Sequence, residues 1–143
     1  MNDSGYSGTP LARKLGLKAG QAALLLGVPL GLGEITDFSG FSTRESSISR
    51  VAGRSYDYIH VFETQRSLLD GLAPEVAARL RPDGMLWISW PKKASKVPTT
   101  LTEDVLRDVF LPLGLVDVKV CAVDAVWSGL KFMFRREFRD RLS

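Results

Sequence analysis

The sequence predicts an α/β domain with a mainly parallel β-sheet that closes with a C-terminal antiparallel hairpin. The segment Ala22 to Val28 is a continuous apolar run, which is typical of an interior parallel strand covered on both faces. The segment Tyr56 to Phe62 is rich in aromatic and β-branched residues, which is typical of a second strand. Segments with helical spacing lie between the later strands, and the last part of the chain alternates apolar and polar residues. The order strand, helix, strand, helix, strand, helix, hairpin favours right-handed crossovers within one sheet.

The composition is that of one globular domain. The chain has 143 residues, of which 45% are hydrophobic and 24% charged, enough to bury a core of ordinary size. We therefore expect a single domain over residues 1–143, with an N-terminal arm and short helix at 1–16 and a basic tail at 136–143. Cys121 is the only cysteine, and no apolar run reaches the roughly 18 to 20 residues of a membrane span. These features predict a cytoplasmic protein with no membrane partner.

The charge balance limits the expected partners. The formal net charge of +3 and the sequence pI of about 9.2 are modest for a dedicated nucleic-acid binder. Nucleic acid is therefore not an expected partner, and a small anionic ligand is the alternative. Neither the oligomeric state nor a substrate follows from the sequence.

The N-terminal part predicts one short helix before the first strand. Thr9 suits the capping position, Pro10 suits the first helical position, and Gly16 suits the position after the last. The strand Ala22 to Val28 follows, between glycine-containing segments.

Residues 29–55 are rich in Gly and Ser and show no clear period. They predict a short helix near residues 32–38 and an edge strand near residues 47–51. We expect this part of the fold to be reduced, because so few residues separate the first two strong strands.

A helix and a third strand are expected after Tyr56 to Phe62. Apolar residues recur every four positions from Leu68 to Leu80, which predicts one buried helical face. Gly71 and Pro74 interrupt this segment and predict a kink or two short helices. The strand Met85 to Trp90 follows a turn.

The last elements are a helix and a hairpin. Thr100 and Glu103 have the spacing of a capping box, and Gly114 suits the end of the helix. The alternation from Val116 to Ala122 and from Leu130 to Phe134 predicts two antiparallel strands. The valines of the first of these strands are expected to face the core.

Three segments together resemble class I S-adenosylmethionine-dependent methyltransferases. They are Ala23 to Gly31, Ser55 to Phe62 and Leu80 to Ser89, similar to the family's first strand and glycine-rich loop, fourth strand, and turn with fifth strand. The resemblance covers roughly residues 15–135. It implies a three-layer, Rossmann-like (methyltransferase-like) sheet, reduced here in the region of the second and third strands.

A narrower resemblance is to a small uncharacterised bacterial family, a domain of unknown function. It rests on Gly5 to Leu11, Ser89 to Ser95, and Gly114 to Ala122 with Trp127 to Leu130. This resemblance implies no particular activity.

The methyltransferase resemblance implies a cofactor site at Gly27, Pro29 and Gly31, with Glu63 at the next strand end. Methyltransferases of this class also carry an acid at the end of the first strand and another after the second, which accepts the ribose hydroxyls. Here Leu25 occupies the first acidic position, and Pro29 replaces the middle glycine of the loop. The acid after the second strand has no clear counterpart, and Glu34 and Asp37 are candidates by residue type alone. The sequence therefore predicts no cofactor; S-adenosylmethionine is possible but disfavoured.

A second candidate site is the loop Trp90, Lys92, Lys93 and Ser95. Ligands of open α/β sheets lie beyond the carboxyl ends of the strands, and this loop leaves such an end. The lysines could hold a phosphate or carboxylate while Trp90 offers a stacking face; the alternative is an ordinary solvated loop. No metal site is predicted, and His60 is expected in the core.

The leading hypothesis is a non-catalytic or degenerate methyltransferase-like domain that binds a small anionic ligand. The first alternative is an S-adenosylmethionine-dependent methyltransferase of unknown substrate. The second is a nucleic-acid or protein adaptor that uses the basic tail. Whether the protein is an enzyme stays open at this point.

Overall fold

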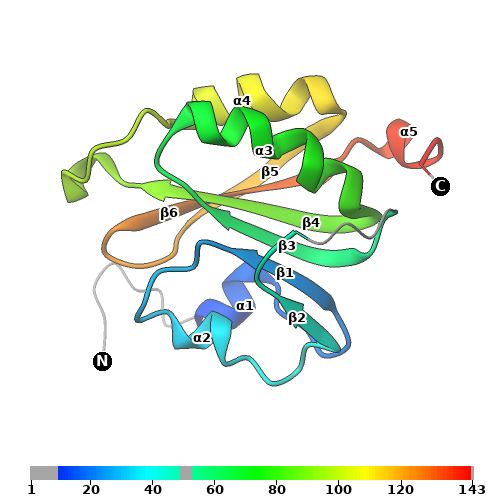
Figure 1. Ribbon diagram of the computed structural model, residues 1–143, viewed down its shortest axis with the longest axis horizontal. Coiled ribbons are helices and arrows are strands. Elements are labelled where there is room, and N and C mark those ends of the chain that lie inside the picture. Colours follow the sequence, from blue (N-terminus) through cyan, green and yellow to red (C-terminus); the bar gives the residue numbers. More distant parts are fainter. Residues whose placement is uncertain (1–9, 49–52, 143) are drawn as a thin grey trace.

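The computed structural model describes residues 10–48 and 53–142. Within them, six strands form one sheet in the order β2-β1-β3-β4-β6-β5. The strands are β1 (Ala22–Leu26), β2 (Thr43–Glu45), β3 (Tyr56–Phe62), β4 (Leu80–Pro91), β5 (Leu115–Ala122) and β6 (Trp127–Phe134). The first four in this order are mutually parallel, and β6 runs antiparallel to both β4 and β5. The predicted mainly parallel sheet with a closing antiparallel hairpin is confirmed (Figure 1).

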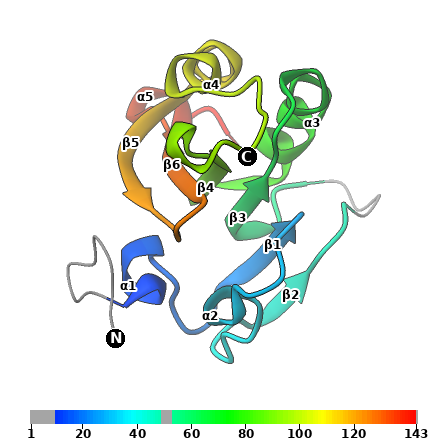
Figure 2. The same ribbon diagram turned by 90° about the vertical axis from the view of Figure 1, so that its left-hand side faces the viewer.

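Helices cover both faces of this sheet. One face carries α1 (Leu11–Leu15) and α2 (Gly33–Thr36), and the other carries α3 (Arg66–Arg79) and α4 (Glu103–Phe110), as Figures 1 and 2 show. The short helices are η1 (Lys93–Ser95), η2 (Leu111–Leu113) and α5 (Arg136–Arg139). The result is the three-layer arrangement that the sequence predicts.

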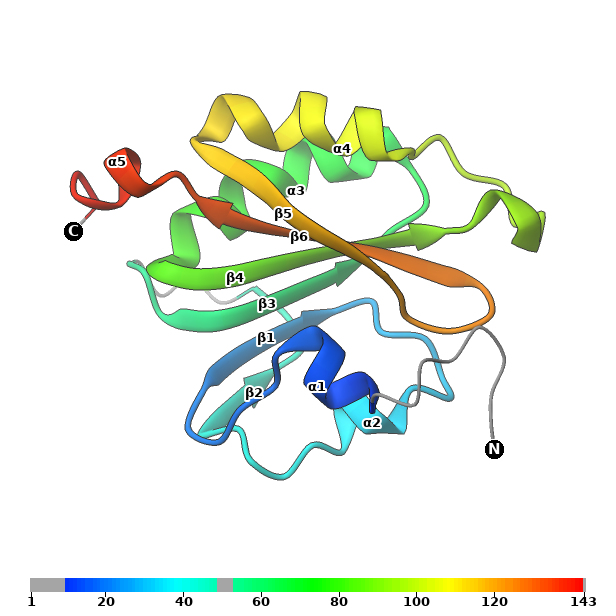
Figure 3. The ribbon, with the colours of Figure 1, turned by 180° about the vertical axis from the view of Figure 1, so that it is seen from behind.

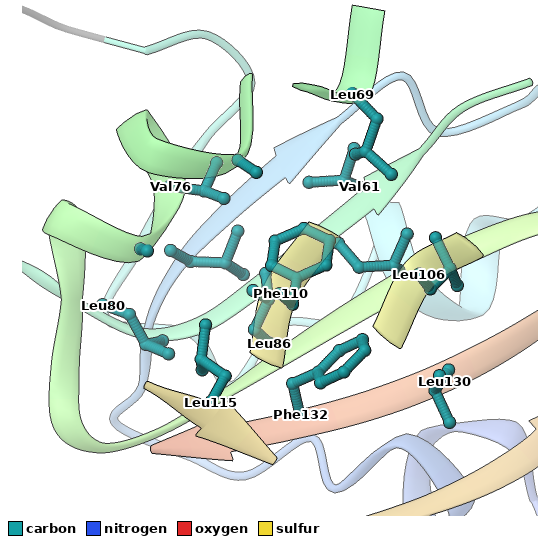
Figure 4. Packing of buried hydrophobic residues seen from close by; sticks show 14 of the residues in the cluster. Val61, Leu69, Val76, Leu80, Leu86, Leu106, Phe110, Leu115, Leu130 and Phe132 are labelled. Atoms are coloured by element: carbon teal, nitrogen blue, oxygen red, sulfur yellow. The ribbon is translucent and has the colours of Figure 1, made fainter. Parts of the chain in front are cut away.

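The larger core lies between the sheet and the pair α3 and α4. Leu86, Phe110 and Phe132 are fully buried there, and Figure 4 shows them pointing toward one another from a strand, a helix and the hairpin. Each such side chain contributes about 1.5–3 kcal/mol through removal of apolar surface from water. This core therefore holds the sheet against the two longer helices, α3 and α4.

The second core lies between the sheet and the short helices α1 and α2. Its central side chain is Trp87, fully buried, whose indole Nε1 donates to the carbonyl of Leu15 at 2.9 Å. Gly16 ends α1 with φ +76°, a left-handed conformation that glycine adopts without steric cost. The hydrogen bond from Trp87 therefore fixes the end of α1 against β4.

The predicted buried face of α3 is confirmed at Val76, and Leu72 packs against the same core, but the prediction is wrong at Leu68. The buried residues are Leu69, Ala73, Val76 and Ala77, whereas Leu68 is 60% exposed. A spacing of four residues drifts by about 40° per step around a helix of 3.6 residues per turn, so a stripe of that spacing cannot stay on one face.

The segment does not divide into two short helices, because α3 is one helix that continues through Pro74. Pro74 lacks the N–H that would donate to the carbonyl of Asp70. Both residues are exposed, so water can satisfy that carbonyl instead.

The edge strand lies earlier than predicted. Residues 43–45 form β2, which pairs with Ala22 to Leu24 of β1. Of the predicted segment 47–51, residues 49–51 lie outside the described residues. The reduction predicted for this part of the fold is confirmed, because its edge strand β2 has only three residues. All three are exposed.

The valines of β5 do not face the core as predicted. Val116, Val118 and Val120 are 38%, 49% and 46% exposed. β5 is an edge strand, and the pairing with β6 shifts register between Asp117 and Lys119. This irregularity interrupts the alternation on which the prediction rested.

The predicted capping residue of α4 is also different. Thr102, not Thr100, caps α4, and its hydroxyl accepts from the amide of Val105. The hydroxyl of Thr100 instead accepts from the amide of Arg66 at 2.7 Å, at the start of α3. Thr100 therefore ties the loop after β4 to the loop after β3.

The segment 136–143 has local structure up to residue 142. Phe138 of α5 stacks on Phe134 with a centroid distance of 5.9 Å, and the Nε of Arg139 donates to the carbonyl of Phe134. The basic residues of this segment are thus attached to the end of β6.

Candidate functional site

A pocket of about 540 Å³ lies where β1 and β2 end. Parallel strands bring their carboxyl ends to the same edge of a sheet, where open α/β folds bind ligands. The lining combines apolar, acidic and basic side chains with a glycine: Leu25, Gly27, Val28, Thr36, Asp37, Arg44, Glu45 and Ser46.

Gly27 turns the chain directly after β1. Its φ is +72°, and a Cβ at this position would lie 2.8 Å from the carbonyl oxygen of Phe62 at the end of β3. Only glycine fits both the conformation and the close approach. Because Gly27 is exposed, its backbone is open to a ligand in the pocket.

The other predicted loop residues lie outside the pocket lining. Gly31 has φ +93°, with no atom within 4 Å of a Cβ built there. Pro29 is half-buried. The structure therefore brings Gly27 to the pocket, but not Pro29 or Gly31.

Glu45 ends β2 and is the acid that the sequence analysis missed. It lies beside Leu24 of β1 in the parallel register, and its Oε1 accepts a hydrogen bond from the Tyr56 hydroxyl at 2.5 Å. Its side chain is exposed, so the carboxylate keeps room to accept further hydrogen bonds. The missing signal was the strand itself, since Thr43 to Glu45 contains no apolar residue.

Asp37 supplies the second carboxylate of the lining. It follows the last residue of α2, and its Oδ2 would lie 3.0 Å from a Cβ at Gly33. Of the two acids proposed by residue type, Asp37 lines the pocket, whereas Glu34 is not among the lining residues. Leu25, where methyltransferases of this class carry an acid, forms an apolar wall.

Glu63 has a different role in the structure. Its Oε2 accepts hydrogen bonds from the amides of Thr64 and Gln65, at 2.8 and 3.1 Å. These amides precede the first residue of α3, Arg66, so Glu63 holds the loop that leads from β3 into the helix. Glu63 is not among the residues that line the pocket.

A second pocket, of about 590 Å³, lies beside the end of β4 on the α4 side. It brings together Trp90 and Lys93 of the predicted anion site, but not Lys92 or Ser95. The Ser95 hydroxyl donates to the carbonyl of Lys92 at 2.6 Å, so it holds the turn. Whether this loop binds an anion stays a prediction.

Acidic residues dominate the α4 side of that pocket. Arg107 forms ion pairs with Asp117, Glu103 and Asp104 at 2.9 to 3.1 Å. The hydrogen bond to Asp117, followed by that to Glu103, raises the pKa of Arg107. These carboxylates already compensate the charge of Arg107. Lys93, the lysine of the pocket lining, would therefore have to supply most of the attraction for an anion.

His60 lies in the core, as predicted, within a hydrogen-bonded chain. Its Nδ1 lies 3.0 Å from the Tyr58 hydroxyl and its Nε2 lies 2.7 Å from the Ser89 hydroxyl. Burial lowers the pKa of His60 to about 3. The ring is therefore neutral at physiological pH and has no exposed surface, which excludes proton exchange with a substrate in this conformation.

Two further findings concern only the described residues. They contain no group of three His, Cys, Asp or Glu side chains placed to hold a metal ion. They also contain no helix with the length and apolar character to cross a bilayer.

Comparison with known proteins gives structural matches only. No protein-family model and no curated protein matches the chain. An S-adenosylmethionine-dependent methyltransferase from Aquifex aeolicus superposes with a TM-score of 0.63 at 16% identity, over 87% of this chain and 88% of its own. The fold is that of S-adenosylmethionine-dependent methyltransferases.

Two further methyltransferase structures agree with this assignment. Magnesium protoporphyrin IX methyltransferase from Synechocystis, solved with bound S-adenosylmethionine, matches with a TM-score of 0.59 at 12% identity, over 87% of this chain and 74% of its own. A TehB-like methyltransferase from Corynebacterium glutamicum has the same TM-score and identity, over 87% of both chains. The methyltransferase-like fold predicted from the sequence is thereby confirmed, while the narrower resemblance to the uncharacterised bacterial family stays a prediction.

Proposed function

We propose that the pocket between β1 and β2 binds S-adenosylmethionine and that the protein is a methyltransferase. The observation that carries this proposal is Glu45, an exposed carboxylate at the tip of the second strand, beside the pocket that contains Gly27. An acidic residue after the second strand could not be identified in the sequence, and its apparent absence favoured a degenerate domain. Together with Glu45, the solved methyltransferase structures support the alternative hypothesis, a methyltransferase, better than the non-catalytic one.

The pocket fits the adenosyl half of the cofactor. Its volume of about 540 Å³ lies in the usual range for small-molecule sites, about 300 to 1,000 Å³. Glu45 would accept hydrogen bonds from the ribose hydroxyls, as the acid after the second strand does in dinucleotide folds. Val28 and Leu25 provide apolar contact, and the exposed backbone of Gly27 allows close approach.

The methionine half fits less well. Leu25 cannot accept a hydrogen bond from the cofactor's ammonium group, and Pro29 has no N–H to donate to its carboxylate. Asp37 is the remaining carboxylate in the lining, and it would take the ammonium group. Most of the affinity would therefore come from the adenosyl half.

The roles of this chain's residues follow from that division. Glu45 and Asp37 would orient the ligand, while Gly27 leaves room beside the end of β3. When bound, the cofactor supplies a methyl group on a sulfonium centre, which needs no metal. The acceptor is not defined by the pocket, and the loop at Lys92 and Lys93 stays a candidate for an anionic group on it.

Calorimetric titration with S-adenosylmethionine and S-adenosylhomocysteine tests the proposal. We expect micromolar binding of both ligands and a loss of roughly tenfold to a hundredfold in Glu45→Gln, since a hydrogen bond to a charged group contributes about 1.5–3 kcal/mol. Glutamine keeps the acceptor for Tyr56, so the local structure is preserved. Glu34→Gln is the matched control, because it removes the same charge from an exposed residue outside the pocket lining.

Two results would contradict the proposal. Absence of binding at millimolar ligand would restore the degenerate-domain hypothesis. Equal losses in Glu45→Gln and Glu34→Gln would show that the pocket at Glu45 is not the binding site.

A further inference from the structure

Four lysines gather on the α1 side of the β5–β6 hairpin. Lys119 lies directly opposite Lys131 in the antiparallel register, and Lys131 lies opposite Trp87 of β4. Trp87 is in turn held to the end of α1 through Leu15. Figures 2 and 3 show α1 next to this face of the hairpin.

The helix adds two positive charges to the pair on the hairpin. Lys14 lies within α1 and Lys18 lies just after it. Burial lowers the pKa of Lys131, and the charges of Lys119 and Lys18 lower it further. Lys14 and Lys119 both act on the Cys121 thiol beside them. We call Lys14, Lys18, Lys119 and Lys131 the lysine face.

The charge of the lysine face is not compensated within the described residues. Every ion pair found there uses an arginine as its cation. In residues 10–48 and 53–142, none of the four lysine ammonium groups has a hydrogen bond or ion pair; the bond from Lys18 to Gln21 comes from its backbone amide. Like charges directly opposite each other on neighbouring strands are destabilising, so an anionic partner would relieve the repulsion.

The exposed apolar residues of the described chain help to select among anionic partners. The exposed large hydrophobic residues in the described part of the chain are leucines and valines, without an aromatic ring. Base stacking on single strands and anchoring at a membrane interface both depend on exposed aromatic side chains. A second copy of the chain would bring two positive faces together. The dense phosphate charge of a duplex remains as the complementary partner.

We propose that the lysine face binds the phosphate backbone of duplex nucleic acid. Binding is independent of base sequence, since four lysines present point charges and no planar group to read base edges. The site is separate from the cofactor pocket, because β1 and β5 are four strands apart in the sheet order. None of its four lysines belongs to the basic segment that follows β6.

The modest net charge of the whole chain does not oppose this proposal. The net charge of +3 averages over acidic residues that are bound to arginines elsewhere, such as the three around Arg107. What a phosphate backbone meets is the local field. Sequence order does not reveal that field, because Lys14 and Lys131 come from opposite ends of the chain.

Fluorescence anisotropy with a labelled duplex of arbitrary sequence tests the proposal. If about four phosphates are neutralised, the slope of log K against log salt is about −3 to −4, so binding weakens roughly 100-fold between about 50 and 200 mM salt. The double variant Lys119→Glu/Lys131→Glu should weaken binding more than tenfold at low salt. Lys14→Glu/Lys18→Glu, on a different element, should do the same, and it guards against misfolding of the hairpin variant.

The matched control is Arg136→Glu/Arg141→Glu, which makes the same change in net charge on two exposed residues of the basic segment. We expect it to change affinity less than about threefold. An equal or larger loss in this control would overturn the proposal in favour of the basic tail. Absence of duplex binding at low salt, or stronger binding to a single strand or to anionic vesicles, would also overturn it. S-adenosylhomocysteine binding should be unchanged in the lysine variants, so failure here is distinguishable from failure of the proposed cofactor site.

Discussion

A hydrogen bond between Tyr56 and Glu45 links β3 to β2, the two strands on either side of β1. The Tyr56 hydroxyl, at the start of β3, donates to Oε1 of Glu45, at the end of β2, with a distance of 2.5 Å. The bond passes across β1, since β2 and β3 lie on its two sides. Tyr56 thus limits the positions that the Glu45 carboxylate can take at the mouth of the pocket.

Tyr56→Phe should therefore affect both stability and ligand affinity. Loss of a hydrogen bond to a charged group is expected to lower the free energy of unfolding by about 1–3 kcal/mol. The freed carboxylate loses its fixed orientation, so S-adenosylhomocysteine affinity should fall severalfold. Denaturant unfolding and calorimetry measure the two effects. Tyr58→Phe, which alters a buried hydroxyl on the other face of the sheet, should lower stability without a comparable loss of affinity.

Gly27→Ala should cost more stability than Gly31→Ala. Both glycines have positive φ, but only at Gly27 does the new Cβ meet a backbone atom, the carbonyl oxygen of Phe62 at 2.8 Å. Strain from positive φ costs about 1 kcal/mol at each site, and the contact adds to it at Gly27. Thermal or denaturant unfolding of the two variants measures the difference, and equal destabilisation would show that the loop relaxes away from β3.

The stability of the protein should fall at acidic pH because of His60. In the unfolded chain its pKa is near 6.5, whereas burial lowers the folded-state pKa to about 3. The unfolded state thus binds the proton first, and the free energy of unfolding decreases as pH falls through this window. The loss between pH 7 and pH 4 amounts to roughly 3 kcal/mol from this residue.

Urea unfolding at several pH values checks this prediction. In His60→Asn, which keeps a polar group beside Tyr58 and Ser89, the dependence between pH 7 and pH 4 should become shallower. An unchanged slope in the variant would contradict the assignment and leave the carboxylates as the cause of any acid sensitivity.

Thr100→Val should weaken the start of α3, although Thr100 precedes α4 in the chain. Its hydroxyl accepts from the Arg66 amide, and removal of a capping group costs about 0.5–2 kcal/mol. Amide hydrogen exchange should therefore accelerate at the first turn of α3. Loss of protection at α4 instead would contradict the contact between Thr100 and the start of α3.

The parts of the fold that could be predicted are those whose burial leaves a mark in the sequence. β1 is a continuous apolar run, and β3 is rich in aromatic and β-branched residues. Gly16 and Gly114 mark helix ends through their left-handed conformations. β2 left no such mark, because Thr43 to Glu45 is wholly exposed and belongs to an edge.

The candidate site was predictable only where it depends on the chain's own backbone. Gly27 could be located because it follows a recognisable buried strand, in the position of the glycine-rich loop of the methyltransferases that the sequence resembles. Glu45 could not, since its role depends on the pairing of β2 with β1. Pairing also explains the lysine face, whose members are distant in sequence and meet only through the hairpin and α1.

The measurement that tests the central claim most directly is a two-dimensional NMR titration of the labelled protein with S-adenosylhomocysteine. The account predicts that the largest amide shifts fall at the ends of β1 and β2, at Gly27, Val28, Asp37, Glu45 and Ser46. Small changes should occur at Trp90 and around Arg107. No shifts at millimolar ligand, or shifts confined to the pocket beside Trp90, would contradict the placement of the cofactor at Glu45.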